Sequence, residues 1–428
     1  MRLLAYLFAL ALLPITLMAS ASAVIATKSP GLLAPSNSSG PSGPSGSAPF
    51  PSSTTPIQAP SPCAATLPNG NTPPGENPGP LHHGNGALWT VLWTEGRVVF
   101  EPGGPGSVEP DGSLSMKFPW WRGVRGQLTI EGRRLDATAP PLRAFILREY
   151  GDIGFQPTAL IFPTVGCWEV TGRVSDSSLT FVTQVVKANA AANVSAASFS
   201  GTELAADSIA TAFGSGLATT TGEATGATLP TVLAGTTVKI GSVAGTGRDA
   251  PLFFVSPRQV NYQIPPGTAN GRVTVSIISS DGQLSSGKID IVTVAPGLFG
   301  ANANGQGAAA AVALRVRADN SRTFEPVFRF DAAQNRFVSI PLDLGPEGEQ
   351  VFLILFGTGI RSRGSLAAVT ARIGGADAQV TFAGAQGSLV SLDQVNLLIP
   401  RILIGRGAVE IALTADGKIA NTVEANIR

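Results

Sequence analysis

Short hydrophobic runs separated by turn sequences fill the stretch from residue 85 to residue 190. The turns are rich in Gly and Pro, as at 101–106 (EPGGPG) and 110–112 (PDG). No helical period of comparable length competes with the strand pattern. Turn signals at this spacing predict an antiparallel β-sandwich. The runs expected to form strands span residues 88–93, 97–100, 127–130, 159–162, 167–170 and 179–186.

The C-terminal half of the chain contains an internal repeat. Residues 255–265 align without a gap with residues 390–400, at an offset of 135. The pairs Asp281-Gly282 and Asp416-Gly417 keep this offset, and each follows an alternating hydrophobic run, which is typical of a hairpin. The half therefore contains two copies of one supersecondary unit. We expect residues 197–295 and 296–428 to superpose as two sandwiches.

Two further features of the repeats bear on their fold. Gly-x-Gly pairs at 214/216 and 357/359 follow β-rich runs. A dinucleotide-binding loop would need a following helix and a third glycine, so a turn or bulge between strands is expected. If the alignment is right, Val260 and Val395 share one burial state, because register on a strand fixes the buried face. The stretch 308–344 in the second copy has the character of an insertion, and we expect an added hairpin there.

These motifs resemble those of a known family. Residues 250–261 (APLFFVSPRQVN), 295–299 (APGLF), 356–360 (FGTGI) and 393–396 (DQVN) are similar to the Solibacter-type uncharacterised C-terminal domain of exported bacterial proteins. The resemblance covers about residues 197–428. Each copy is also similar to IPT/TIG modules, which implies tandem immunoglobulin-like sandwiches. The family has no assigned reaction, so the resemblance implies fold and export rather than chemistry.

The N-terminus has the pattern of an export signal followed by a spacer. Residues 3–17 are apolar, and Ala21-Ser22-Ala23 supplies small residues for signal-peptidase cleavage. Residues 1–23 are therefore expected to be a signal peptide, with an uncleaved anchor as the alternative. No cysteine follows the apolar run, so a lipid anchor is not expected. Residues 24–84 are mostly Ser, Pro, Gly, Thr, Asn and Ala, which predicts a disordered linker that holds the folded part away from the N-terminus.

Composition excludes several functional classes. The 428 residues contain 29 Lys and Arg against 28 Asp and Glu, so the chain has no basic footprint for nucleic acid. Two His and two Cys exclude a zinc cluster or a His-rich metal site, and no cofactor is expected. All five Trp lie between 85 and 190, which makes this a separate unit with a boundary near residue 190. Asp281-Gly282 and Asp416-Gly417 lack the further acidic residues of calcium loops, so they are interpreted as turns.

The two cysteines of the chain are expected to form a disulfide. On a strand over residues 166–170, Trp168 and Val170 share one face and Cys167 lies on the other. An exported protein with two cysteines usually joins them, and the partner is Cys63 at the end of the spacer. The bond would attach the spacer to the first unit. Two free thiols are the alternative.

One local run suggests a ligand. It contains Lys117, Trp120, Trp121, Arg122 and Arg125. Adjacent tryptophans on a strand cannot both point inward, so an exposed Trp beside Arg122 could stack on a sugar ring or another aromatic plane. The alternative is that Pro119 breaks the alternation and that both indoles pack in the core.

The sequence favours a non-catalytic, exported protein of several β-sandwiches that serves recognition or adhesion, located in the periplasm or outside the cell. The expected partner is a protein or a glycan at the cell surface, and no transmembrane segment is expected after signal cleavage. His82 and His83, both at the edge of the spacer, make histidine-dependent catalysis improbable. The alternative function is a glycan-active hydrolase whose catalytic unit is residues 85–190, with acids such as Glu149 and Asp152. A third hypothesis gives the C-terminal pair a role in secretion or surface retention.

Overall fold

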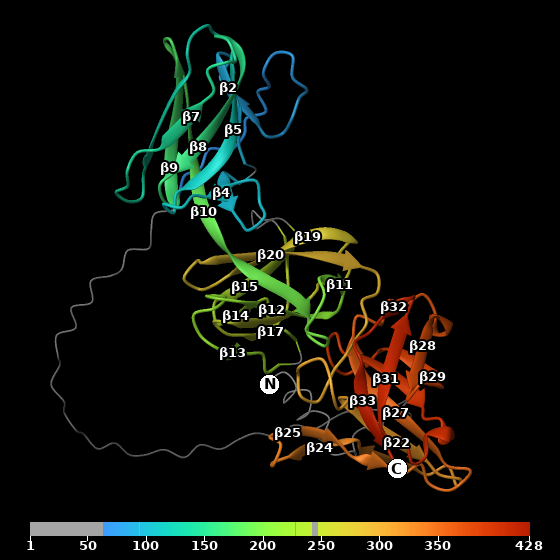
Figure 1. Cartoon of the computed structure of the whole chain (residues 1–428). Helices are drawn as coiled ribbons and strands as arrows, with labels where there is room; N and C mark the ends of the chain where they lie inside the picture. The colour runs from blue at the N-terminus through green and yellow to red at the C-terminus, as the bar shows by residue number, and fades with distance from the viewer. Residues whose placement is uncertain (1–62, 94, 227, 242–246) are drawn as a thin grey trace, which may run out of the picture.

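The computed structural model of the chain contains three β-sandwich units in a row (Figure 1). The structure describes residues 63–93, 95–226, 228–241 and 247–428. The expected signal peptide (1–23) and residues 24–62 of the expected spacer lie outside this part. Regular structure in the described residues consists of strands and two short 3-10 helices, η2 (Leu366–Ala368) and η3 (Arg401–Leu403). The predicted all-β class is therefore confirmed.

The first unit is a sandwich of two mainly antiparallel sheets. Its strands are β1 (His82–Gly84), β2 (Leu88–Val91), β3 (Arg97–Phe100), β4 (Ser107–Val108), β5 (Leu114–Arg122), β6 (Thr129–Arg134), β7 (Arg143–Ile146), β8 (Gly154–Phe162), β9 (Gly166–Val174) and β10 (Ser177–Ser195). One sheet has the order β1-β2-β5-β8-β7, and the other places β10 between β3 and β9, with β6 beyond β9. Each of the six expected runs overlaps an observed strand. The core between the sheets contains Trp120, Trp168 and Phe181.

The second unit has its own core, which contains Val260 and Tyr262. Its strands after β10 are β11 (Glu203–Ala205), β12 (Ile209–Gly214), β13 (Gly222–Glu223), β14 (Val232–Leu233), β15 (Thr236–Gly241), β16 (Arg248–Asp249), β17 (Leu252–Val255), β18 (Gln259–Gln263), β19 (Gly271–Ile278) and β20 (Leu284–Val292). One sheet runs β13-β17-β18-β12-β10, and the other runs β10-β20-β19-β15-β14.

The third unit repeats this plan with additions. Its strands are β21 (Gly297–Leu298), β22 (Ala311–Val316), β23 (Arg322–Pro326), β24 (Phe328–Asp331), β25 (Arg336–Ser339), β26 (Pro341–Leu342), β27 (Gln350–Thr358), β28 (Val369–Ile373), β29 (Ala376–Ala385), β30 (Asp393–Leu398), β31 (Gly407–Ala415), β32 (Lys418–Ile419) and β33 (Val423–Ile427). The strand order is β23-β22-β27-β30-β29-β28-β31-β33-β26. Strands β24 and β25 pair only with each other, so the hairpin expected within 308–344 is present.

The strand register of the second and third units follows the alignment of the two passages. Val260 on β18 lies opposite Ala212 on β12, and Val395 on β30 lies opposite Leu355 on β27. Both valines are fully buried, as expected from the alignment. The partner strands β17 and β29 each have a register irregularity at the corresponding place. The two copies therefore share strand pairing as well as sequence.

The Gly-x-Gly pairs are turns, as expected. Gly216 and Gly359 have φ of 67° and 74°, a backbone conformation that disfavours residues with a side chain. A Cβ at Gly359 would also lie 2.1 Å from the carbonyl oxygen of Ala295. Asp416 and Gly417 both have positive φ and join β31 to β32 in a two-residue hairpin.

One continuous strand joins the first and second units. β10 pairs with β9 and β3 in the first unit, and its later residues pair with β20 and β12 in the second (Figure 1). The boundary expected near residue 190 therefore falls inside a strand. The loop after β3 adds a contact, because Glu101 accepts a hydrogen bond from Ser286 at 3.2 Å and lies 3.7 Å from the Lys288 ammonium.

An ion cluster and a small apolar cluster join the two repeats. The Arg361 guanidinium lies 2.6 Å from Asp207 of the second unit and 2.7 Å from Asp393 of its own unit. The backbone N–H of Ile209 also donates to the Thr358 hydroxyl across the interface. Apolar residues of both repeats pack beside these groups, among them Ala196, Ala197, Ile209, Phe299, Ala310 and Leu392.

Candidate binding surface

The tryptophan run lies on β5, which alternates between buried and outward positions along its whole length. Trp120 is fully buried and packs against Phe118 and Phe181 in the core. Trp121 points to the outer face of the sheet and is partly exposed. Pro119 does not break the alternation. Of the two indoles, only Trp121 can therefore meet a ligand, and the expected stacking role is wrong for Trp120.

The strand continues through Pro119 because threonine hydroxyls complete the hydrogen bonding beside it. Pro119 lies opposite Pro157 on β8, and neither residue has an amide hydrogen to donate. The Thr90 hydroxyl donates to the carbonyl of Pro119 at 2.8 Å. The Thr158 hydroxyl donates to the carbonyl of Phe118 at 2.6 Å. Threonine hydroxyls thus satisfy the carbonyl groups on either side of the Pro119 ring.

Arg122 is buried as well, so it is not a direct ligand-stacking residue. Its guanidinium donates to the carbonyl oxygens of Gly126, Tyr150 and Gly151, at 2.9–3.1 Å. Burial lowers the pKa of Arg122, and the nearby Asp152 carboxylate opposes this shift. Arg122 therefore acts from inside the sandwich to fix the loop between β7 and β8.

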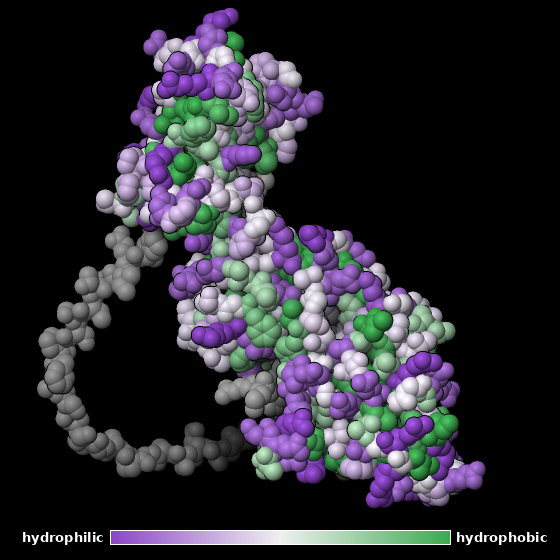
Figure 2. All heavy atoms as spheres, viewed as in Figure 1, coloured by the Kyte–Doolittle hydropathy of each residue, from purple (hydrophilic) through white to green (hydrophobic). Residues whose placement is uncertain are grey.

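That loop and the outer face of the sheet present an aromatic patch, which we define as His82, Trp121, Tyr150 and Phe155. The ring centroids of Trp121 and Phe155 are 5.4 Å apart, and Tyr150 and His82 extend the row at 6.1 and 5.9 Å. Tyr150 and Phe155 are each 44% exposed. Figure 2 shows hydrophobic surface in the upper unit over β7 and β8, which follow β5 in the order of this sheet.

Charged groups lie at the edge of the aromatic patch. The Trp121 indole N–H donates to Glu76 at 3.1 Å. Arg125 pairs with Asp152 at 3.1 Å, and both side chains are largely exposed. Aromatic rings with a few polar groups around them are the usual composition of a site that fixes a ligand's orientation.

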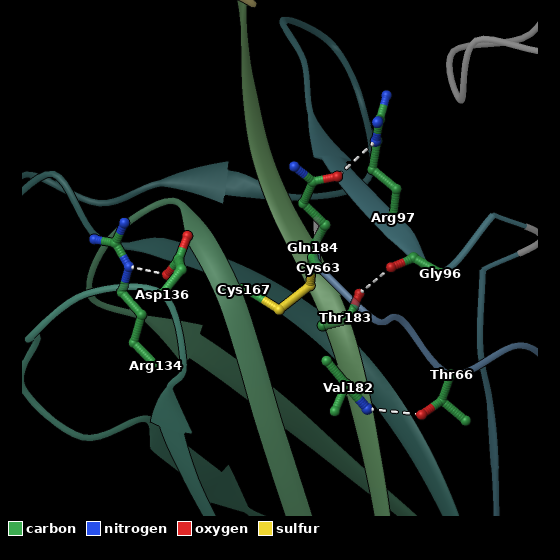
Figure 3. The surroundings of a disulfide bond; sticks show 10 residues. All are labelled: Cys63, Thr66, Gly96, Arg97, Arg134, Asp136, Cys167, Val182, Thr183 and Gln184. Carbon is green, nitrogen blue, oxygen red and sulfur yellow. Dashed lines mark hydrogen bonds and ion pairs between the residues drawn. A yellow bond between two sulfur atoms is a disulfide. The ribbon is translucent and has the colours of Figure 1, made fainter. Parts of the chain in front are cut away.

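The predicted disulfide is present. Cys63 and Cys167 are bonded with a Cα–Cα distance of 5.5 Å (Figure 3). Trp168 and Val170 are in the core, and Cys167 faces the incoming segment, as the strand parity predicted. Beside the bond, Thr66 exchanges two hydrogen bonds with the backbone of Val182, at 2.8 and 2.9 Å.

The expected disordered linker, residues 24–84, includes at its C-terminal end residues that are part of the first unit. The described residues 63–84 lie against the first unit and end in β1, which pairs with β2. Asn71 accepts a hydrogen bond from the indole of Trp89, and Asn69 binds the backbone of Gly84. The low-complexity composition gave no sign of this attachment, because the contacts use backbone groups and short polar side chains. We call residues 63–84 the anchored segment.

Sequence reasoning did not identify Tyr150, Phe155 or Glu76. The signal for Phe155 was available, because β8 carries Phe155, Pro157, Ala159 and Ile161 on alternate, outward positions. Tyr150 lies in a charged loop that resembled an ordinary solvated loop. The contact of Glu76 with Trp121 depends on where the anchored segment lies, and this is determined by tertiary contacts.

The two histidines and the Asp281 turn, for which no catalytic or metal-binding role is expected, contact other residues of the fold. His82 contacts Trp121, while burial lowers the pKa of His83. No group of three His, Cys, Asp or Glu side chains within the described ranges is arranged to hold a metal ion. Asp281 accepts hydrogen bonds from the Ser279 hydroxyl and the Gln283 amide, as in a turn.

Two concave regions lie apart from the aromatic patch. A cleft of about 490 Å³ between the first and second units is lined by polar residues such as Arg134, Lys187 and Asp281. A pocket of about 310 Å³ in the third unit includes Glu349 and Arg401. No aromatic side chain lines either of them.

No family model and no curated protein matches the chain. Seventy-six solved chains match in structure. One is the Bacteroides ovatus mixed-linkage glucan utilization locus SGBP-B in complex with mixed-linkage heptasaccharide, at 12% identity over 77% of this chain and 69% of that chain, TM-score 0.26. Another is the N-terminal eight Ig domains of Down Syndrome Cell Adhesion Molecule, at 9% identity over 78% and 35%, TM-score 0.16. A third is the N-terminal four Ig domains of Dscam1 isoform 6.44, at 11% over 80% and 99%, TM-score 0.17.

At these identities and TM-scores, the likenesses carry no argument about function. The described part of the chain contains no helix long and apolar enough to cross a membrane.

Proposed function

We propose that this protein is an exported, non-catalytic recognition protein that binds a glycan through the aromatic patch of its first unit. The observation that carries the proposal is the row of four aromatic rings on an outer sheet face, with a carboxylate bonded to the central indole.

The chemistry of the patch fits a sugar better than a purely apolar ligand. An aromatic face carries negative potential and attracts the polarised C–H groups on one face of a pyranose ring. Glu76 contacts the central indole, and the exposed pair Arg125–Asp152 lies in the loops that follow β5 and precede β8, where these groups can hydrogen-bond hydroxyl groups at the edge of the sugar. Trp121 and Phe155 lie on the outer face of a sheet, so the ligand would lie along the surface.

The hydrolase alternative requires two carboxyl groups that a substrate on the first unit can reach. A glycosidase needs a carboxylic acid that keeps its proton near neutral pH. Burial raises the pKa of Asp393, although Arg361 and two backbone N–H groups oppose the shift. This carboxyl is fully buried between the two repeats and cannot reach a substrate. Near the patch, Asp152 is paired with Arg125 and Glu76 with Trp121. These contacts favour binding over hydrolysis.

Replacing Trp121 with alanine is expected to weaken glycan binding at least tenfold, because the central ring of the patch is lost. The measurement is a glycan array printed with neutral β-linked hexasaccharides, followed by titration calorimetry on those that bind. The oxidised chain without its first 23 residues is the protein to use. Phe324→Ala is the matched control, since this exposed aromatic lies on β23 of the third unit. Equal affinity of wild type and Trp121→Ala, or no bound glycan on the array, would contradict the proposal.

The export of the protein and its membership in the Solibacter-type family are also part of this proposal. The disulfide and the signal-like N-terminus support export to the periplasm or the cell exterior. The Solibacter-type motifs lie in the two repeats, whose paired register supports an immunoglobulin-like plan for each copy.

A further inference from the structure

We infer that the anchored segment is part of the binding site, that Glu76 contacts the sugar directly, and that the Cys63–Cys167 disulfide positions this residue together with the hydrogen bonds of the segment. The inference rests on the proposed function, because it names a specificity residue and a positioning element of the same patch. It assigns a role to a stretch whose composition is that of a linker.

The anchored segment crosses the edge of the sheet beside the aromatic patch. Its first residue is bonded to β9, and its last residues form β1 at the edge of the sheet. Between these two attachments the segment carries Glu76, which accepts the hydrogen bond from Trp121, and His82, whose ring lies edge-on to the same indole. The patch is therefore assembled from two parts of the chain.

Glu76 is exposed and is well placed for a second partner. Its Oε1 accepts the indole N–H, so Oε2 can accept hydrogen bonds from a ligand. A carboxylate accepts hydrogen bonds only, and each oxygen has two lone pairs, so Oε2 and the remaining lone pair of Oε1 suit two neighbouring hydroxyl groups. The ligand class that this arrangement selects is a neutral sugar with a free vicinal diol next to the face that stacks on Trp121.

The segment near Glu76 is held by hydrogen bonds rather than by regular secondary structure. It has no helix, and β1 begins only at His82. Upstream of Glu76 the segment is held by the disulfide and by the hydrogen bonds of Thr66 to Val182. Residues 69–72 add hydrogen bonds to His82, Gly84 and Trp89. Without the covalent bond, residues 63–76 can occupy more positions. Glu76 then lies beside Trp121 in a smaller fraction of the molecules. The disulfide therefore affects affinity through the position of Glu76.

The first arm of the test measures Glu76 directly. Wild type, Glu76→Gln and the control Glu131→Gln are titrated with a β-linked hexasaccharide that binds on the array and with its O-methylated counterpart. Glu131 lies on β6 in the other sheet of the same unit and pairs with Arg173. We expect Glu76→Gln to bind the free-hydroxyl sugar at least tenfold more weakly, since hydrogen bonds to charged groups are strong. We expect no difference between wild type and Glu76→Gln on the methylated sugar.

The second arm measures the disulfide. The double variant Cys63→Ser/Cys167→Ser is expected to bind the hexasaccharide at least fivefold more weakly, while tryptophan fluorescence shows a folded first unit. A glutamyl endopeptidase should cut after Glu76 faster in this variant than in wild type. If the double variant does not fold, the same comparison is made on wild type treated with dithiothreitol, which becomes a cyclic disulfide as Cys63 and Cys167 become thiols.

The outcomes separate this inference from the proposed function. If Trp121→Ala loses binding but Glu76→Gln and the folded disulfide variant keep wild-type affinity, the inference is wrong and the proposed function stands. If no sugar binds to wild type, the proposed function is wrong. Loss of binding in all three variants, with the Glu131→Gln control intact, supports both.

Discussion

Replacing Arg361 with methionine is expected to lower the free energy of unfolding of the two repeats by about 3–5 kcal/mol, the usual effect of removing one partner of a buried ion pair. Asp393 has no exposed surface, and Arg361 is its only charged partner among the described ion pairs. The variant leaves this carboxylate buried with backbone N–H groups alone. It also removes the bond from Arg361 to Asp207 of the neighbouring repeat.

The distribution of tryptophan makes this effect measurable. Because all five Trp lie in the first unit, their fluorescence follows that unit, whereas circular dichroism follows the strands of all three. In a urea titration, Arg361→Met should move the dichroism transition to lower urea and leave the fluorescence transition in place. Arg372→Ala is the control, since the Arg372–Asp377 pair is 64% and 84% exposed and should contribute less than about 0.5 kcal/mol. Unchanged dichroism in Arg361→Met would show that the ion cluster does not stabilise the repeats.

Strand pattern and repeat could be predicted from the sequence because both depend on local order along the chain. Alternation at Val260 and Val395 fixes which face of each strand is buried, and the structure confirms it for both. Cys167 was placed correctly by the same parity argument. These predictions needed no knowledge of which segments meet in space.

The binding surface could be predicted only in part, because it depends on tertiary contacts. Strand parity indicated that one of Trp120 and Trp121 faces outward, but a proline in the run made the strand itself uncertain. The compensation by Thr90 and Thr158 comes from strands 29 and 40 residues away and cannot be inferred from the run. The attachment of Glu76 to Trp121 spans 45 residues.

Substitution by alanine should have different effects at the neighbouring residues Trp120 and Trp121. At Trp120 it should lower stability, and at Trp121 it should lower glycan binding. Trp120→Ala is expected to lower the free energy of unfolding of the first unit by about 3–5 kcal/mol, because a fully buried indole leaves a cavity. The Trp120 ring also lies flush against Gly172 of β9, where a Cβ would come within 2.5 Å of it. Its indole nitrogen has no hydrogen-bond partner within the described residues, so the loss concerns packing alone.

Trp121→Ala is the matched comparison, since it removes the same side chain one residue further along the strand. Because Trp121 is on the outer face, the expected loss of stability is about 1 kcal/mol or less, while glycan binding falls at least tenfold. The measurement is a urea titration followed by the fluorescence of the four remaining tryptophans, with binding measured on the same samples below the transition. If Trp120→Ala is as stable as wild type and loses binding, then Trp120 faces the ligand and the strand register of β5 is wrong. If Trp121→Ala unfolds as easily as Trp120→Ala, the outer indole serves the fold rather than a ligand.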